Sequence, residues 1–94
     1  MSNRGVAKIY RRHRAVREDE LDGVLFLIDE EEKSIHALEP LGRAIWLLLL
    51  EPSATGEIVA LLSEAFPGVP RGRIAADVRR LLSDLEDSNL ISAQ

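Results

Sequence analysis

The feature of this sequence that most constrains its fold is a series of three helical patterns separated by proline-containing breaks. The first pattern begins at Pro40, which suits the first turn of a helix because its missing N–H would be unpaired there, and it is apolar on nearly every side. Pro52 ends it, and a second pattern follows up to Phe66. Residues 67–70 (Pro-Gly-Val-Pro) precede a third, which runs to about Ser88. A helix that is apolar all round belongs in the middle of a domain, so we expect the other helices to pack around the first.

The segment before these helices has the composition of β-strands. Residues 24–28 combine β-branched and aromatic side chains and are apolar on both faces, which predicts a central strand. Residues 34–38 have the pattern of a further strand, and residues 14–18 that of a weaker first strand. The dipeptide Asp22-Gly23, which lies between this first strand and residues 24–28, is typical of a hairpin turn. We therefore expect an α+β fold in which a three-stranded antiparallel sheet, with residues 34–38 at its edge, is followed by three helices.

Charge is distributed unevenly along the chain. The first 17 residues carry six basic side chains and no acidic one, whereas the remaining 77 carry six basic and all 16 acidic side chains. The formal net charge is therefore −4. We expect residues 1–13 to be a flexible basic tail and residues 14–94 to form one domain with a modest core. An acidic domain repels the phosphate backbone, so a nucleic-acid partner is disfavoured.

Nothing in the composition points to a membrane or to an oxidising compartment. The chain has no cysteine, which excludes disulfides and thiolate chemistry within it. The basic start lacks the apolar stretch of a secretory leader. The longest apolar run, residues 44–50, is far shorter than the roughly 20 residues that span a bilayer. We therefore expect a soluble, cytoplasmic protein without a membrane partner.

The residue types needed for catalysis or metal binding are sparse. His13 and His36 are the only histidines, which gives no metal-ligand spacing and argues against a Ser-His-Asp triad. No glycine-rich loop resembles a phosphate cradle. The acidic run at residues 29–32 could hold a cation weakly, but a solvated turn is the simpler interpretation. We predict no catalytic residue, no metal and no cofactor, so an enzyme is the least favoured class.

Four short motifs occur in an order that resembles one family. They are Leu-x-Pro-x-Gly-x-Ala-Ile-Trp at residues 38–46, Ser-x-Thr-x-Glu-Ile at residues 53–58, Asp-Val-x-x-Leu-Leu-x-x-Leu at residues 77–85 and Asn-Leu-Ile at residues 89–91. Residues 23–91 are thereby similar to the PqqD family, the pyrroloquinoline-quinone biosynthesis protein D. That family is the prototype of the RiPP recognition elements, which capture the leaders of ribosomally made precursor peptides. The second motif departs slightly, because Gly56 stands directly before its glutamate.

The resemblance implies a fold related to winged helix-turn-helix domains and a particular peptide site. In such elements the leader adds as a fourth antiparallel strand to the third strand and lies in a groove walled by the third helix. The unpaired N–H and C=O groups of an exposed edge bind an extended peptide largely regardless of its sequence, and pockets beside the edge give selectivity. The implied peptide-binding residues are Lys33, Ser34, Ile35, His36, Ala37 and Leu38 at the edge, and Arg73, Ile74, Asp77, Val78, Arg80 and Leu81 in the wall.

The wall residues also have a purely structural interpretation. Ile74, Val78 and Leu81 recur at helical spacing and fit a core stripe better than the floor of a pocket. Arg73 and Arg80 are either ordinary surface charges or a clamp for an acidic peptide.

Four further side chains carry alternatives of the same kind. His36 is interpreted first as a partly buried strand residue, and Trp46 as core packing. Leu25 and Leu27 lie on the face of the central strand opposite Phe26. That face is either a surface for a partner or a second copy, or a surface covered by the tail.

Three functions are compatible with these patterns. The first is a non-catalytic chaperone that presents a precursor peptide to a maturation enzyme, such as a radical-SAM protein or a leader peptidase. The alternative is a winged-helix DNA-binding transcriptional regulator, since the third helix carries Arg71, Arg73, Arg79 and Arg80. The third is a small subunit that only stabilises a larger enzyme. The sequence leaves the precursor, the modification and a homodimeric state open.

Overall fold

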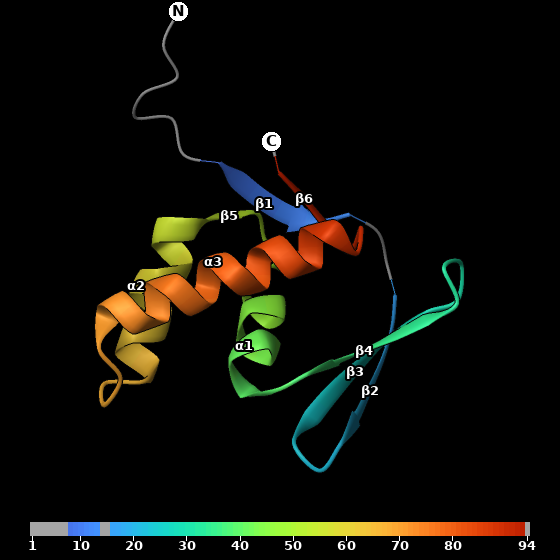
Figure 1. The fold of residues 1–94 in the computed structure, drawn as a ribbon, viewed down its shortest axis with the longest axis horizontal. Helices are drawn as coiled ribbons and strands as arrows, with labels where there is room; N and C mark the ends of the chain where they lie inside the picture. The colour runs from blue at the N-terminus through green and yellow to red at the C-terminus, as the bar shows by residue number, and fades with distance from the viewer. Residues whose placement is uncertain (1–7, 14–15, 94) are drawn as a thin grey trace, which may run out of the picture.

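The computed structural model describes residues 8–13 and 16–93 and has the expected α+β fold (Figure 1). The elements follow the order β1 (Ile9–Arg12), β2 (Arg17–Leu21), β3 (Val24–Asp29), β4 (Ser34–Leu38), α1 (Pro40–Leu48), β5 (Ser53–Ala54), α2 (Thr55–Ala65), α3 (Arg71–Asp87) and β6 (Ile91–Ala93). The three predicted helices are all present, and Pro40 is the first residue of α1. No helix in the described part of the chain is long and apolar enough to cross a bilayer.

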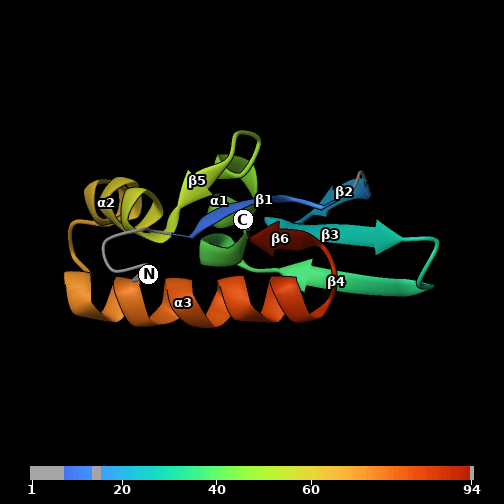
Figure 2. The ribbon, with the colours of Figure 1, turned by 90° about the horizontal axis from the view of Figure 1, so that it is seen from above.

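The strands form two separate antiparallel sheets. β2, β3 and β4 make the predicted meander, with β4 at one edge. β1 lies between β5 and β6 in the second sheet. Figure 2 shows α3 running along one side of the molecule, past α2 and α1, with β4 beside its C-terminal half. The hairpin of β3 and β4 extends beyond the helices (Figure 1).

Left-handed residues set the ends of two elements. Asp22 and Gly23 have φ angles of 53° and 82°, as a two-residue type I′ hairpin turn requires, and they join β2 to β3. Asn89, which follows the C-cap residue Ser88 of α3, has a φ of 60°, and the next N–H, of Leu90, bonds back to the carbonyl of Leu85 at 3.0 Å. This turn folds Leu90 and Ile91 into the core, where both are buried.

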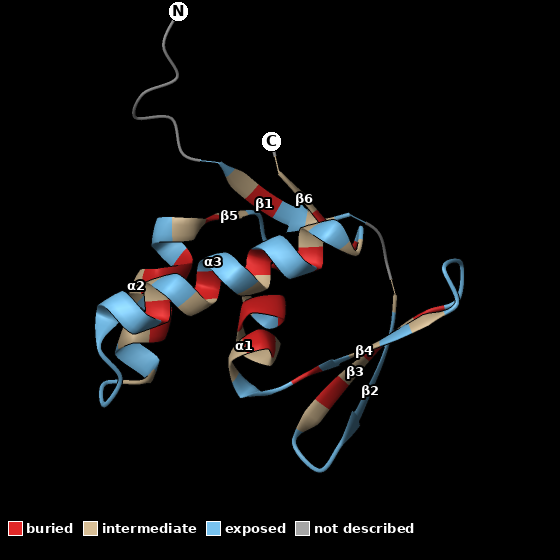
Figure 3. Ribbon diagram, viewed as in Figure 1, coloured by how far each residue is buried: buried red, intermediate tan, exposed pale blue. Residues whose placement is uncertain are grey.

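The core lies where the faces of the three helices meet β3 (Figure 3). Trp46 is at its centre, as expected for an all-apolar first helix. The other largest fully buried side chains are Leu27, Ile45, Leu49, Ile58, Ile74, Leu82, Leu90, Ile91 and Val78.

The interpretation of Leu25 and Leu27 as a partner surface was wrong. Their exposed fractions are 4% and 0%, so this face of β3 packs on the helices, whereas Phe26 and its alternate neighbours are only half-buried on the outer face. Because both faces of this strand are apolar, the sequence alone gives no sign of which one is turned inward. The packing of the helices determines which face is buried, because they cover the side on which Leu25 lies opposite Leu38.

Part of the predicted basic tail is a strand. Residues 9–12 form β1, which pairs with Ser53–Ala54 on one side and with Ile91–Ala93 on the other. These partners lie more than forty residues away in the sequence, so no local periodicity predicts the strand. The first strand of the meander begins at Arg17, later than predicted. Residues 1–7 of the tail and residues 14–15 of the predicted strand lie outside the described residues.

Arg12 joins β1 to α1 and, through Glu18, to β2. Its Nη2 donates to the carbonyl oxygen of Trp46 at 2.6 Å, and its guanidinium lies 4.0 Å from the centroid of the indole ring. Its Nη1 lies 3.3 Å from the Glu18 carboxylate, which also accepts a hydrogen bond from Trp46 Nε1 at 3.1 Å. Burial lowers the pKa of the Arg12 guanidinium and Glu18 opposes that shift, but an arginine stays protonated in proteins. One charged network therefore connects the two sheets to the central helix.

We expect Arg12→Met to lower the free energy of unfolding by about 1–3 kcal/mol, because it removes a charged donor and a cation–π contact from this network. Urea denaturation followed by Trp46 fluorescence measures the change. Arg17→Met is the matched control, because Arg17 pairs with Glu30 at the surface, where the two side chains are 64% and 74% exposed, and such pairs contribute at most about 1 kcal/mol. Equal losses in the two variants would contradict the role given to Arg12.

Candidate peptide-binding edge and groove

β4 has unpaired backbone groups on the side away from β3. The two-residue turn before β3 closes on a hydrogen-bonded pair, so the backbone groups of Val24 face β2. The direction then alternates along β3, so Leu27 faces β4, where it pairs with His36. Ile35 and Ala37, on either side of His36, must therefore direct their N–H and C=O groups outward. β4 can accept one more strand through these two residues.

The two edges of this sheet differ in charge. β2 has the sequence Arg-Glu-Asp-Glu-Leu, whose exposed charged side chains are a common protection of edge strands against further pairing. β4 has the sequence Ser-Ile-His-Ala-Leu, without an acidic or a permanently charged side chain. The sheet is therefore protected on one side and open to an added strand on the other.

A groove of about 340 Å³ lies between this open edge and α3. Leu38, Leu81 and Leu85 give it an apolar lining, and Asp84 and Ser88 add polar groups from the last turns of α3. Residues 35–37 and Gly42 complete the lining. An extended peptide beside β4 would thus direct alternate side chains toward a mostly apolar hollow.

His36 is held within this site by a neighbour on its own strand. Its Nε2 lies 3.1 Å from the hydroxyl of Ser34, two residues earlier and on the same strand face. Both residues are half-buried, whereas Ile35 between them is 67% exposed on the outer face. The alternation places His36 and Leu38 toward the groove and Ile35 toward solvent.

The structure brings only part of the predicted site together. Residues 35–38 and Leu81 line the groove. Ile74 and Val78 are 2% and 0% exposed and belong to the core, so the structural interpretation of these two side chains is confirmed. Lys33 lies in the turn before β4, with a positive φ of 54°.

The other predicted wall residues lie elsewhere on the same flank of α3. Arg73 and Asp77 line a second hollow of about 260 Å³ together with Pro40, Leu41 and Phe66. Arg80 contacts Asp77 at 4.0 Å and Asp84 at 3.7 Å along the exposed side of the helix. Arg73 therefore lines a hollow, whereas Arg80 lies on the exposed surface of the helix.

Sequence reasoning missed four lining residues, Gly42, Asp84, Leu85 and Ser88. Three of these follow Leu81 at steps of three or four along α3, so extending the stripe from Leu81 toward the C-terminus would have found them. Gly42 sits in the first turn of α1, and a Cβ added there would lie 3.6 Å from Leu38 and 3.8 Å from Leu81. Its missing side chain leaves the strand and the helix in close approach beneath the groove.

Because those distances are ordinary van der Waals contacts, we expect Gly42→Ala to raise the free energy of unfolding by about 0.5–1 kcal/mol through helix propensity. Gly72→Ala is the matched control, because it is also in the first turn of a helix and a Cβ there meets nothing within 4 Å. Urea titrations of both variants measure the effect. Destabilisation by Gly42→Ala alone would show that Leu38 and Leu81 do not accommodate a methyl group.

Comparisons with known proteins show the family of this chain. The sequence profile of the family described as coenzyme PQQ synthesis protein D (PqqD) matches residues 25–91, well over half of the chain. The chain belongs to the PqqD family. The part that matches PqqD runs from β3 into β6 and contains both the open edge of β4 and all of α3.

One solved structure adds a ligand to the comparison. TbiB1 in complex with the TbiA(beta) leader peptide is similar to this PqqD family member with a TM-score of 0.75 and 26% sequence identity. The similarity covers 87% of this chain and 94% of TbiB1. No curated protein matches the chain.

Proposed function

We propose that this protein is a non-catalytic peptide chaperone that binds the leader of a ribosomally synthesised precursor peptide. The observation that carries the proposal is the uncharged, unpaired edge of β4 beside an apolar groove. It occurs in a PqqD-family fold, and the similar TbiB1 is a protein solved with a leader peptide. The leader adds to β4 as a fourth strand and is presented from there to a maturation enzyme, such as a radical-SAM protein or a leader peptidase, in the cytoplasm.

The division of labour within the site follows from strand geometry. The outward N–H and C=O groups of Ile35 and Ala37 supply hydrogen bonds that any extended peptide can make. Selectivity comes from the leader side chains that point into the groove, at every second residue. Leu81 and Leu85 favour an apolar side chain there, and the carboxylate of Asp84 favours a neighbouring hydrogen-bond donor.

Ala37→Pro tests strand addition directly. It removes one outward N–H of β4, while the bonds to β3 stay in place because proline is tolerated at a free edge. We expect the affinity for the leader to fall about tenfold or more, the equivalent of one hydrogen bond. The measurement is a fluorescence-anisotropy titration of the full chain with the labelled leader of the precursor encoded beside it.

Ala37→Val is the matched control, because it keeps the N–H and suits a strand. It should bind the leader as the unaltered protein does, and circular dichroism of both variants checks that the fold is kept. Unchanged binding by Ala37→Pro would exclude strand addition at this edge. Absence of saturable binding by the unaltered protein would exclude leader recognition altogether.

A further inference from the structure

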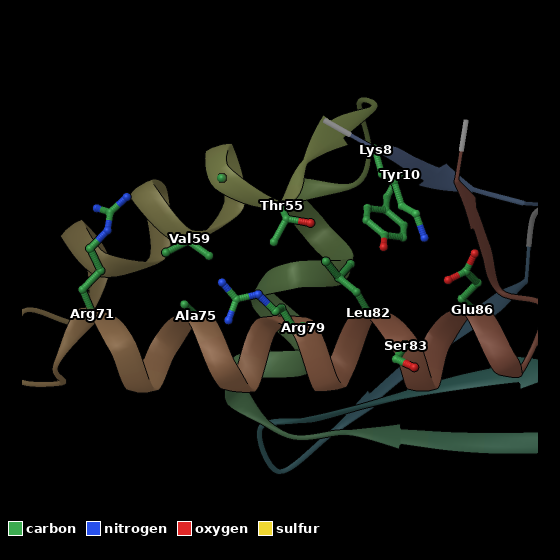
Figure 4. A pocket seen from close by; sticks show the side chains of 11 residues that line it. Lys8, Tyr10, Thr55, Val59, Arg71, Ala75, Arg79, Leu82, Ser83 and Glu86 are labelled. Carbon is green, nitrogen blue, oxygen red and sulfur yellow. The ribbon is translucent and has the colours of Figure 1, made fainter. Parts of the chain in front are cut away.

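A second groove lies on the flank of α3 away from β4. β1, the start of α2 and α3 enclose about 630 Å³ there, nearly twice the volume of the groove beside β4 (Figure 4). Its lining includes Lys8, Arg71 and Arg79, and Glu86 is the one carboxylate among the described lining residues. The leader site shares no lining residue with this groove, so two ligands could occupy the two flanks of α3 together.

The three cations of this groove have no acidic partner among the residues that the structure describes. In the described parts of the chain no carboxylate lies within ion-pair distance of Lys8, Arg71 or Arg79. Arg80, one residue beyond Arg79, instead lies between Asp77 and Asp84. In a chain of net charge −4, a groove with unpaired cations is electrostatically suited to an anionic ligand.

Tyr10 adds a polar group to the groove. It projects from β1 into the groove and is only 9% exposed (Figure 4). Its hydroxyl has no hydrogen-bond partner in the described part of the chain and is not among the polar atoms closed off from solvent, so it can bond to a ligand.

The first turn of α2 borders the groove at the same place, through Thr55 and Gly56. A Cβ at Gly56 would meet nothing within 4 Å, so this approach is open.

The spacing of the arginines indicates the kind of anion. Arg71 and Arg79 are separated by about two turns of α3, a rise of about 12 Å at 1.5 Å per residue, so they place positive charge along the length of the groove. An extended peptide advances about 3.3 Å per residue, so two carboxylates about four residues apart match the arginines and lie on the same side of the strand. A nucleic acid would meet Glu86 and the acidic domain with every phosphate.

We propose that this groove docks an extended acidic segment of a partner protein, with carboxylates about four residues apart opposite Arg71 and Arg79. The hydroxyl of Tyr10 binds the same segment beyond Arg79, on the side of Glu86 (Figure 4). Glu86 repels acidic residues at the β1 end and so sets the position of the segment along α3.

The test is an anisotropy titration of the full chain at low ionic strength with a labelled Gly-Ser-Thr peptide that carries two glutamates about four residues apart. We expect saturable binding that weakens with added salt. Arg71→Gln and Arg79→Gln should each lower the affinity about tenfold, and Tyr10→Phe about threefold. Glu86→Gln should raise the affinity.

Two controls accompany these variants. Arg80→Gln should leave the affinity unchanged, because Arg80 lies outside the groove, and a peptide with glutamines in place of the glutamates should not bind. The proposal is overturned by absent or unsaturable binding, by equal losses in Arg80→Gln and Arg79→Gln, or by tighter Arg79-dependent binding of a short DNA duplex. It is also overturned if Arg79→Gln weakens leader binding, whereas failure of the leader titration alone leaves this groove unaffected.

Discussion

The contact of Arg12 with Trp46 and Glu18 is the interaction on which the arrangement of this molecule depends. The two sheets do not pair with each other, and this contact connects both of them to α1. α1 follows β4 after a single residue, Glu39, and the position of α1 therefore determines how β4 lies against α3. A charged residue in the second sheet thus helps to shape a groove that it does not line.

Local sequence signals predicted most of the scaffold. Pro40 and the break at residues 67–70 both act through the fixed φ of proline, which depends on neighbouring residues alone. The edge position of β4 followed from the order of the strands. β1, β5 and β6 escaped prediction because each is short and pairs with residues distant in the sequence.

The candidate site could be predicted only in part, for a related reason. The order of strands along the chain predicts which strand lies at the edge of a sheet. Which flank of a helix borders a groove depends instead on how the other elements pack against that helix. Ile74, Val78 and Leu81 look alike in a periodic pattern, yet only Leu81 borders the groove, since β4 approaches the C-terminal half of α3. The second groove, between β1, α2 and α3, could not be predicted from the sequence, because β1, which supplies Tyr10, was assigned to the tail.

The contrast between the edges of the meander has a consequence for any complex that forms on it. The charged side chains of β2 disfavour pairing of a further strand at that edge, so a strand can be added only beside β4. A peptide bound there becomes the outermost strand and exposes its own unpaired amides. Whether such a complex stays single or stacks with others then depends on the charges and prolines of the peptide, so colloidal solubility of the complex becomes a property of the bound peptide.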